Sequence, residues 1–177
     1  MIKKVKIIIL LSSVFLISCG SSKKVTKRPS SKRKVTTIKK KKVAQQKQAT
    51  IADKIIWSAV SYKGTPYKYA GVSKSGMDCS GLVYTSFKER NISMPRSSSL
   101  LYKEGYKISL NKAKRGDLLF FKTTNKTRSK INHVAIVTSV NNGVVKFIHA
   151  TSSRGVIEST MLQDYWRKAF IEAKRVL

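Results

Sequence analysis

Residues 133–149 read HVAIVTSVNNGVVKFIH, and this stretch decides how the chain folds. A run rich in β-branched residues is followed by Asn141-Asn142-Gly143, which is typical of a tight hairpin turn, and then by the apolar run Val144–His149. The stretch therefore predicts two antiparallel strands. One histidine lies at the start of the first strand and the other at the end of the second.

Further strands are expected on both sides of this hairpin. Residues 117–121 consist of Asp117 and four apolar residues and predict a buried strand, and a short strand is expected over 155–158. One or two helical turns over 161–167 and a closing strand over 170–176 complete the chain. The segment 71–76 is expected to be a loop, because a glycine lies at each end of it.

Upstream of the sheet, the apolar residues repeat at helical spacing. Thr50 followed by Asp53 is typical of a helix start, which predicts a helix over 51–62. Its expected apolar face consists of Ile51, Ile55, Ala59 and Val60.

Two more helices are expected before the sheet. One begins at Cys79, with Asp78 in the capping position. Another opens at 95–97 and directs Leu100 and Leu101 into the core. Helices first and strands second predict an α+β fold, with N-terminal helices packed on an antiparallel sheet.

The length and charge of the chain limit what it can be. It has 177 residues, 41% of them hydrophobic, which suits one ordinary domain with tails and excludes a multi-domain machine. Two cysteines are too few for a disulfide-stapled miniprotein. The formal net charge is +29, from 37 Lys and Arg against 8 Asp and Glu. Such a charge favours acidic partners.

The first residues resemble an export signal. A basic start is followed by an apolar run over 7–17 that is too short to span a bilayer as a helix. The stretch Leu16-Ile17-Ser18-Cys19 resembles a bacterial lipobox, which implies cleavage after residue 18 and lipidation of Cys19 with diacylglycerol and a further acyl chain such as palmitate. An ordinary signal peptide with a chance cysteine is the alternative.

Residues 19–50 are expected to be a lipidated terminus and a disordered basic linker. Between Gly20 and Thr50 there are twelve Lys and Arg and no acidic residue. Such a segment repels itself, cannot form a core, and can attract anionic envelope polymers. Nucleic acid is not expected as a partner, because the segment is exported and has no aromatic residue to stack on bases. Residues 51–177 are the expected catalytic domain.

Cys79 is the candidate nucleophile. If Cys19 is lipidated, Cys79 is the one remaining thiol, and it lies where a helix is expected to begin. A helix N-terminus lowers the pKa of a thiol, and its N–H groups can bind an oxyanion. The position of Cys79 therefore indicates an enzyme that transfers an acyl group through a cysteine nucleophile.

The two histidines of the chain are the candidate proton carriers. Across the predicted hairpin His133 and His149 lie nearly opposite each other, so one imidazole can take the thiol proton while the other holds its ring. Taken singly, each could be a structural residue, and Cys79 could be an inert core thiol. Zinc binding by these three residues is a further alternative, but no fourth ligand has a recognisable spacing. No metal or cofactor is expected.

At this point the sequence resembles the NlpC-type cell-wall peptidases, and within them the murein endopeptidase lipoproteins of the MepS type. The resemblance covers about residues 51–177. The following segments carry it: Gly64-Thr65-Pro66-Tyr67, Asp78-Cys79-Ser80-Gly81, Met94-Pro95-Arg96-Ser97-Ser98, Arg115-Gly116-Asp117-Leu118, Asn132-His133-Val134-Ala135 and Phe147-Ile148-His149-Ala150.

The resemblance implies a papain-like fold with a Cys-His-His site. Cys79 would be the nucleophile, His133 the general base, and His149 the residue that orients it. Tyr67 would line the oxyanion side, and Ser80 would contact substrate.

Two further matched residues, Arg96 and Asp117, are expected to be structural. The implied activity is a thiol hydrolase that cuts peptidoglycan amides beside diaminopimelate, either D-Glu–diaminopimelate or D-Ala–diaminopimelate. A monomer is expected, anchored through Cys19, in the outer membrane and facing the periplasm. A catalytically weak wall-binding lipoprotein and an amidase or acyl transferase acting on another amide remain alternatives.

Overall fold

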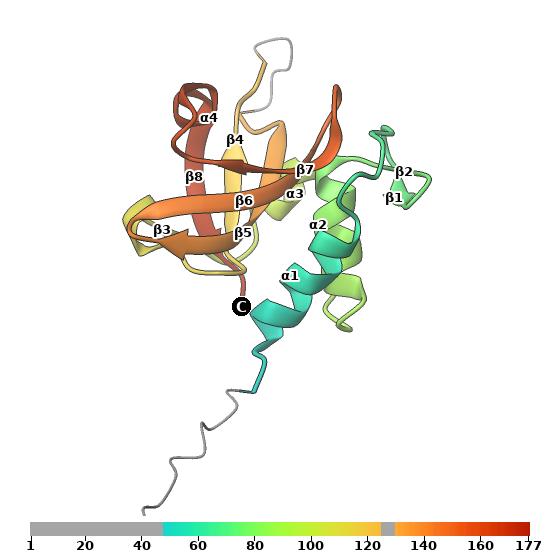
Figure 1. Ribbon diagram of the computed structural model, residues 1–177, viewed down its shortest axis with the longest axis horizontal. Coiled ribbons are helices and arrows are strands. Elements are labelled where there is room, and N and C mark those ends of the chain that lie inside the picture. The colour runs from blue at the N-terminus through green and yellow to red at the C-terminus, as the bar shows by residue number, and fades with distance from the viewer. Residues whose placement is uncertain (1–47, 125–129) are drawn as a thin grey trace, which may run out of the picture. The chain divides into compact units, whose positions relative to one another are not determined.

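A six-stranded antiparallel sheet forms the centre of the domain in the computed structural model (Figure 1), which describes residues 48–124 and 130–177. The order across the sheet is β3-β8-β4-β5-β6-β7. The strands are β3 (Tyr106–Ile108), β4 (Leu118–Phe121), β5 (His133–Asn141), β6 (Val144–Thr151), β7 (Gly155–Thr160) and β8 (Phe170–Arg175). The expected signal peptide, Cys19 and the linker as far as residue 47 lie outside the described residues.

The helices surround this sheet, and a two-stranded ribbon precedes the second of them. The elements are α1 (Ile51–Ser61), β1 (Val72–Ser73), β2 (Gly76–Met77), α2 (Cys79–Lys88), α3 (Ser98–Leu101), the 3-10 turn η1 (Leu110–Lys112) and α4 (Asp164–Ala169). Within 48–124 and 130–177, no helix combines the length and the apolar character needed to cross a membrane.

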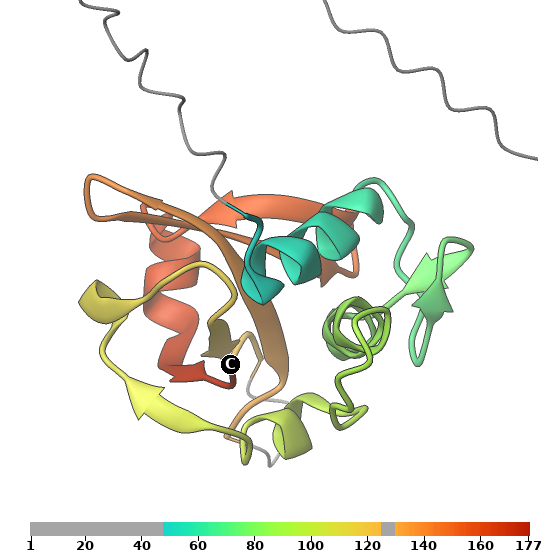
Figure 2. The ribbon, with the colours of Figure 1, turned by 90° about the horizontal axis from the view of Figure 1, so that it is seen from below.

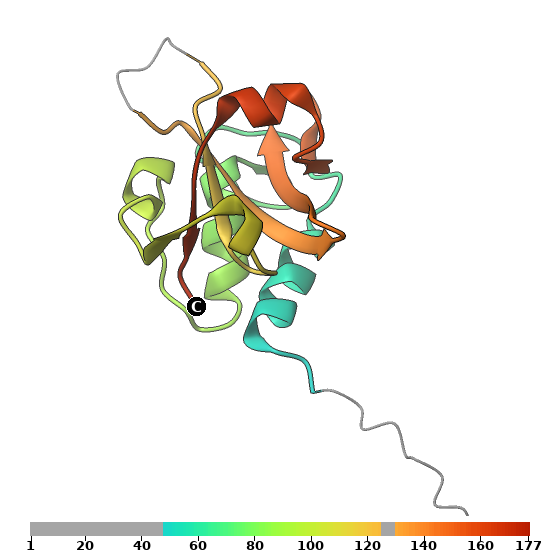
Figure 3. The same cartoon turned by 90° about the vertical axis from the view of Figure 1, so that its left-hand side faces the viewer.

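The sheet is buried on both faces, by different elements. Figure 2 shows α1 and α2 on one side of the strands and α4 on the other, and Figure 3 shows α1 and α4 at opposite ends of the domain. On the first face Leu82 and Phe87 of α2 pack against Ile136 and Ile148. On the other face Trp166 of α4 belongs to a second cluster of buried residues. The α+β fold with helices on an antiparallel sheet is confirmed.

The two longer helices begin where their capping residues were expected. Thr50 caps α1, and its hydroxyl accepts from the Asp53 N–H while the Asp53 carboxylate accepts from the Thr50 N–H. Asp78 caps α2 and accepts from the Gly81 N–H at 2.6 Å. These bonds satisfy N–H groups that have no partner within the helix.

The predicted hairpin between β5 and β6 is confirmed. Asn142 and Gly143 have φ values of 48° and 78°, as a two-residue turn matching the strand twist requires. The register Ile136↔Ile148 follows, with a bulge between Val137 and Ser139.

Several details differ from the sequence prediction. Ile51, Val60 and Leu100 are 43%, 40% and 48% exposed, so the predicted apolar faces are only partly right. Their helices are covered on one narrow side, which Ile55 and Leu101 occupy. The segment 71–76 is part of the β1–β2 ribbon rather than a plain loop, and β3 was not predicted. β3 could not be predicted from an apolar pattern, because its residues are mostly exposed and it lies at the edge of the sheet.

Candidate active site

Cys79 is the first residue of α2, as predicted. Asp78 engages the Gly81 N–H with its side chain and the Leu82 N–H with its carbonyl. The N–H groups of Cys79 and Ser80 lie instead beside the sulfur, as does the backbone of Val134 in β5, and all three lower the pKa of the thiol. The helix start therefore directs two amides at the place where a substrate carbonyl would become negative.

Burial reverses the predicted direction of the thiol pKa. The partly buried Cys79 side chain lies between α2 and β5, and loss of solvation raises the pKa of Cys79 to about 11 despite the surrounding N–H groups, with the Asp78 charge adding to the rise. The prediction that the helix N-terminus lowers the pKa of this thiol was wrong, because desolvation of a thiolate outweighs the field of the helix N-terminus here. We therefore expect the resting group to be a thiol.

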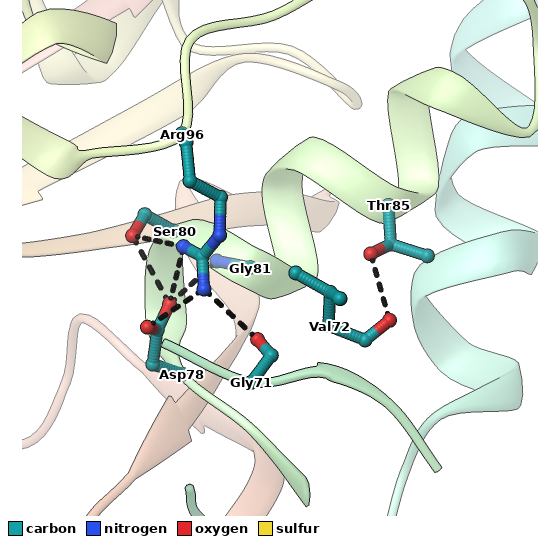
Figure 4. Close-up of polar contacts among 7 residues, drawn as sticks. All are labelled: Gly71, Val72, Asp78, Ser80, Gly81, Thr85 and Arg96. Carbon is teal, nitrogen blue, oxygen red and sulfur yellow. Dashed lines mark hydrogen bonds and ion pairs between the residues drawn. The ribbon is translucent and has the colours of Figure 1, made fainter. Parts of the chain in front are cut away.

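A charged network holds the start of α2 (Figure 4). The Arg96 guanidinium donates to both carboxylate oxygens of Asp78 at 2.9 Å and to the Gly71 carbonyl at 3.0 Å. Ser80 donates to Asp78 and accepts from Arg96, each at 3.0 Å. Burial would raise the pKa of Asp78, but Arg96 and the Gly81 N–H hold it below its ordinary value. The network fixes the residues on both sides of Cys79.

The same view shows how α2 is tied to the ribbon before it. Thr85 donates its hydroxyl hydrogen to the Val72 carbonyl at 3.2 Å (Figure 4). Gly71 lies against the helix, where a Cβ on Gly81 would come within 2.1 Å of the Gly71 carbonyl oxygen. The ribbon, the helix start and Arg96 therefore form one rigid support for the thiol.

The two histidines meet, as predicted. His133 Nε2 lies 2.9 Å from His149 Nδ1, and both rings are buried. His149 Nε2 in turn lies 2.9 Å from the Ser159 hydroxyl oxygen. The contact between Ser159 and His149 was not predicted from the sequence, although a strand was expected over 155–158. A single serine in a strand gives no indication of which side chain it contacts. The result is a buried hydrogen-bonded chain from Ser159 through His149 to His133.

Trp166 encloses this chain from α4. Its ring stacks on His133 at 5.5 Å between centroids and meets His149 edge-on at 4.5 Å. Phe121 and Phe147 contact the same imidazoles from the strands. The aromatic enclosure leaves each imidazole few orientations. Trp166 was predicted only as part of a short helix, since nothing in the sequence indicates which ring it covers.

Burial also keeps both imidazoles neutral. It lowers the pKa of His133 to about 4. It lowers the pKa of His149 to about 2, with smaller contributions from His133 and from the Arg154 charge. Because Nε2 of His133 is engaged by His149, Nδ1 is the nitrogen left to accept a proton. The site therefore pairs a neutral thiol with a neutral base.

Cys79 and His133 both line one cavity of about 550 Å³, together with Tyr67 and Trp166. The sulfur belongs to the helix side of the sheet, whereas the imidazoles lie on the face that α4 covers. His133 is the first residue of β5, and Val134, the next residue, contacts the sulfur. Cys79 and His133 therefore line the same cavity, which lies where β5 begins.

Tyr67 lies beside the nucleophile. It lines this cavity and also a second one of about 290 Å³, which Cys79 lines as well. Burial raises its pKa, and the nearby Cys79 contributes, so the hydroxyl keeps its proton at neutral pH. A protonated hydroxyl can donate to an oxyanion, as predicted, and this role stays a prediction.

The remaining predicted residues have visible structural contacts. Ser80 lines the second cavity, but its hydroxyl is engaged in the Asp78–Arg96 network, so its contact with substrate stays a prediction. Asp117 accepts two bonds of 2.8 Å from Arg175 in β8, which ties β4 to the sheet. The part of the chain that is described contains no group of three His, Cys, Asp or Glu side chains able to hold a metal ion.

The fold and the site together define a cysteine peptidase of the papain-like class. The NlpC/P60 family model matches residues 64–175, and the chain belongs to this family.

Two curated relatives come from Escherichia coli K12. One is named Probable endopeptidase NlpC and is 37% identical over 117 residues, covering 66% of this chain and 72% of the relative. The other, named Murein DD-endopeptidase MepS/Murein LD-carboxypeptidase, is 34% identical over 132 residues, covering 74% and 66%.

Among solved structures, a Staphylococcus aureus protein described as similar to a lipoprotein of the NLP/P60 family superposes with a TM-score of 0.63. It is 33% identical, and the match covers 72% of this chain and 41% of that protein.

Proposed function

We propose that the protein is a peptidoglycan endopeptidase that uses Cys79 as its nucleophile. The observation that carries the proposal is the convergence of Cys79 and His133 on one cavity, with His133 held by a buried partner. The relatives named as murein and NlpC endopeptidases support peptidoglycan as the substrate. The amide bonds that we propose as targets are those beside diaminopimelate.

The attack begins from neutral groups. The Cys79 thiol adds to the amide carbonyl as its proton passes to Nδ1 of His133, so that thiolate and imidazolium form only with substrate in place. The amides of Cys79 and Ser80, with the Tyr67 hydroxyl, donate to the developing oxyanion.

The positions of the ring protons follow from this step. If Nδ1 of neutral His133 is to accept, its hydrogen must lie on Nε2, which then donates to His149 Nδ1. His149 must carry its own hydrogen on Nε2 and donate it to Ser159. The chain of hydrogen bonds thereby sets the tautomer of the base.

The second half restores the enzyme. The His133 imidazolium gives its proton to the leaving nitrogen, the C–N bond breaks, and an amine departs from a thioester on Cys79. Water then attacks the thioester while His133 takes its proton, and a carboxylic acid leaves as the thiol reforms.

We place this activity at the cell envelope. Lipidation of Cys19 would anchor the chain, and the basic residues of 20–50 would lie between the anchor and the domain. Weak attraction of this segment to anionic envelope polymers would keep the domain near its substrate. The outer membrane, facing the periplasm, is the proposed location.

Digestion of purified murein tests the proposal. Wild-type protein should release fragments whose masses identify one cleaved amide bond beside diaminopimelate, and Cys79→Ala should release none. Binding of murein without turnover by the wild-type protein would favour a wall-binding role instead. Cleavage of other amides, with intact murein left uncut, would indicate a different amidase.

A further inference from the structure

Two cavities meet at Cys79, and they differ in which catalytic group they contain. The imidazole-side cavity, of about 550 Å³, is lined by His133, Arg154 and Trp166. The helix-side cavity, of about 290 Å³, is lined by Asp78, Ser80 and Arg96, and His133 does not reach it. Because His133 must protonate the leaving nitrogen, the leaving half of the substrate occupies the imidazole-side cavity.

Arg154 gives the imidazole-side cavity its charge. Among the described residues that line it, Arg154 is the only one charged at neutral pH, since burial keeps His133 neutral. All eight acidic residues of the chain lie within the described ranges, and none of them forms an ion pair with Arg154. Glu158, the acid closest to it in sequence, pairs with Lys63. The guanidinium is thus available to an anionic ligand.

The turn that carries Arg154 is fixed to the active site. It joins β6 to β7, and the Arg154 N–H donates to the Thr151 hydroxyl at 3.1 Å. Gly155 has a φ of 64°, and a Cβ there would lie 2.1 Å from the Thr65 carbonyl oxygen. The Val156 N–H donates to that same oxygen at 2.9 Å. The turn is therefore held against the segment that leads to Tyr67.

We propose that the imidazole-side cavity is a subsite for a leaving group that bears a carboxylate, and that Arg154 selects it. The inference rests on the proposed function. In either candidate bond the released amine belongs to diaminopimelate, which keeps a free side-chain carboxyl. A guanidinium can hold such a group with two parallel hydrogen bonds. Tyr165 and Trp166 line the same cavity and can pack on the carbon chain.

The test uses two muropeptides that differ only at the side-chain carboxyl of diaminopimelate, free in one and amidated in the other. Wild-type protein should prefer the free acid. Arg154→Ala should lower kcat/KM on the free acid by about 10- to 100-fold, as loss of a charge-assisted pair predicts, and change it little on the amide. On the free acid, the kcat/KM of Arg154→Lys should lie between those of the wild type and Arg154→Ala, because the lysine ammonium is a point charge without the planar fork of a guanidinium.

The control is Lys146→Ala, which removes one positive charge from the same β6–β7 hairpin at an exposed position outside the cavity. It should behave as wild type on both peptides, and the Tm of every variant should stay unchanged. An equal loss on both peptides in Arg154→Ala, or no preference in the wild type, would overturn the subsite. If the wild type cuts neither peptide nor murein, the proposed function itself fails.

Discussion

The thiol and its base are held by two regions that work by opposite means. The thiol is supported by a charged network, in which a partly exposed Arg96 pairs with Asp78. The base is supported by neutral groups, Ser159 and His149, which are buried beside Trp166. Charge is stable where one partner still contacts water, whereas in a closed aromatic site it would cost several kcal/mol. From this difference we expect no ion pair between the Cys79 sulfur and the His133 imidazole in the resting site.

The largest effect should come from removing His133, which ends the neutral chain of hydrogen bonds that begins at Ser159. His133→Ala removes the proton acceptor, and kcat on muropeptides should fall by about 10²- to 10⁴-fold, the usual contribution of a general base. KM should change much less, which steady-state kinetics would reveal. A variant with normal kcat would show that the thiol does not need this imidazole.

A smaller effect should come from removing the Ser159 hydroxyl, at the other end of these hydrogen bonds. Ser159→Ala leaves the His149 Nε2–H without its acceptor, so the tautomer that His133 requires is less populated. We expect kcat to fall by about tenfold, in line with the loss of a buried hydrogen bond, and Ser159→Thr to restore it.

Nitrogen-15 NMR of labelled histidine provides the direct measurement, because the chain contains only two imidazoles. In the wild type both rings should carry hydrogen on Nε2, and in Ser159→Ala this pattern should change. Ser86→Ala is the matched control, since it removes a buried hydroxyl that bonds only to the Leu82 carbonyl in α2. Unchanged ring signals in Ser159→Ala would separate Ser159 from the base.

Breaking the charged region should affect stability more than chemistry. Arg96→Ala leaves the mostly buried Asp78 with fewer partners, and we expect a loss of about 2 kcal/mol in urea unfolding, below the full cost of a buried pair because Arg96 is partly exposed. Arg167→Ala, which removes an exposed ion pair with Asp164, is the control and should cost little. Equal losses in the two variants would mean that the network contributes no special support.

The smallest effect should come from a position that touches neither region. Thr50→Ala removes the cap of α1, and the free energy of unfolding should fall by about 1 kcal/mol. Activity measured well below the Tm should remain that of the wild type. A marked loss of kcat would show that α1 positions the site more directly than its contacts suggest.

Local signals in the sequence predicted the elements of the site. Asp78 before Cys79 predicted the helix start, and the Asn-Gly turn placed the two histidines across a hairpin. These features depend on residues close together in the chain. The exposed positions of Val60 and Leu100 could not be read this way, because only tertiary packing decides which side of a helix is covered.

The pKa of the thiol shows a second limit of sequence reasoning. A helix N-terminus is visible in the sequence and favours a thiolate, but the enclosure of Cys79 by β5 is not, and it reverses the sign. Ser159 and Trp166 were missed for the same reason. Ser159 lies on the paired strand β7, two residues from the position opposite His149, and Trp166 lies on α4. No pattern in the sequence shows that these side chains meet His149, and only the folded chain brings them together.

The pH dependence of Cys79 alkylation tests the neutral resting pair most directly. Iodoacetamide reacts with the thiolate, and modification can be assigned to Cys79 by mass spectrometry of its peptide. We expect the rate to be low at neutral pH and to rise with a midpoint at about 11, the value to which burial raises the pKa of this thiol. A full rate already reached below pH 7 would mean that thiolate and imidazolium coexist at rest, and would contradict the account.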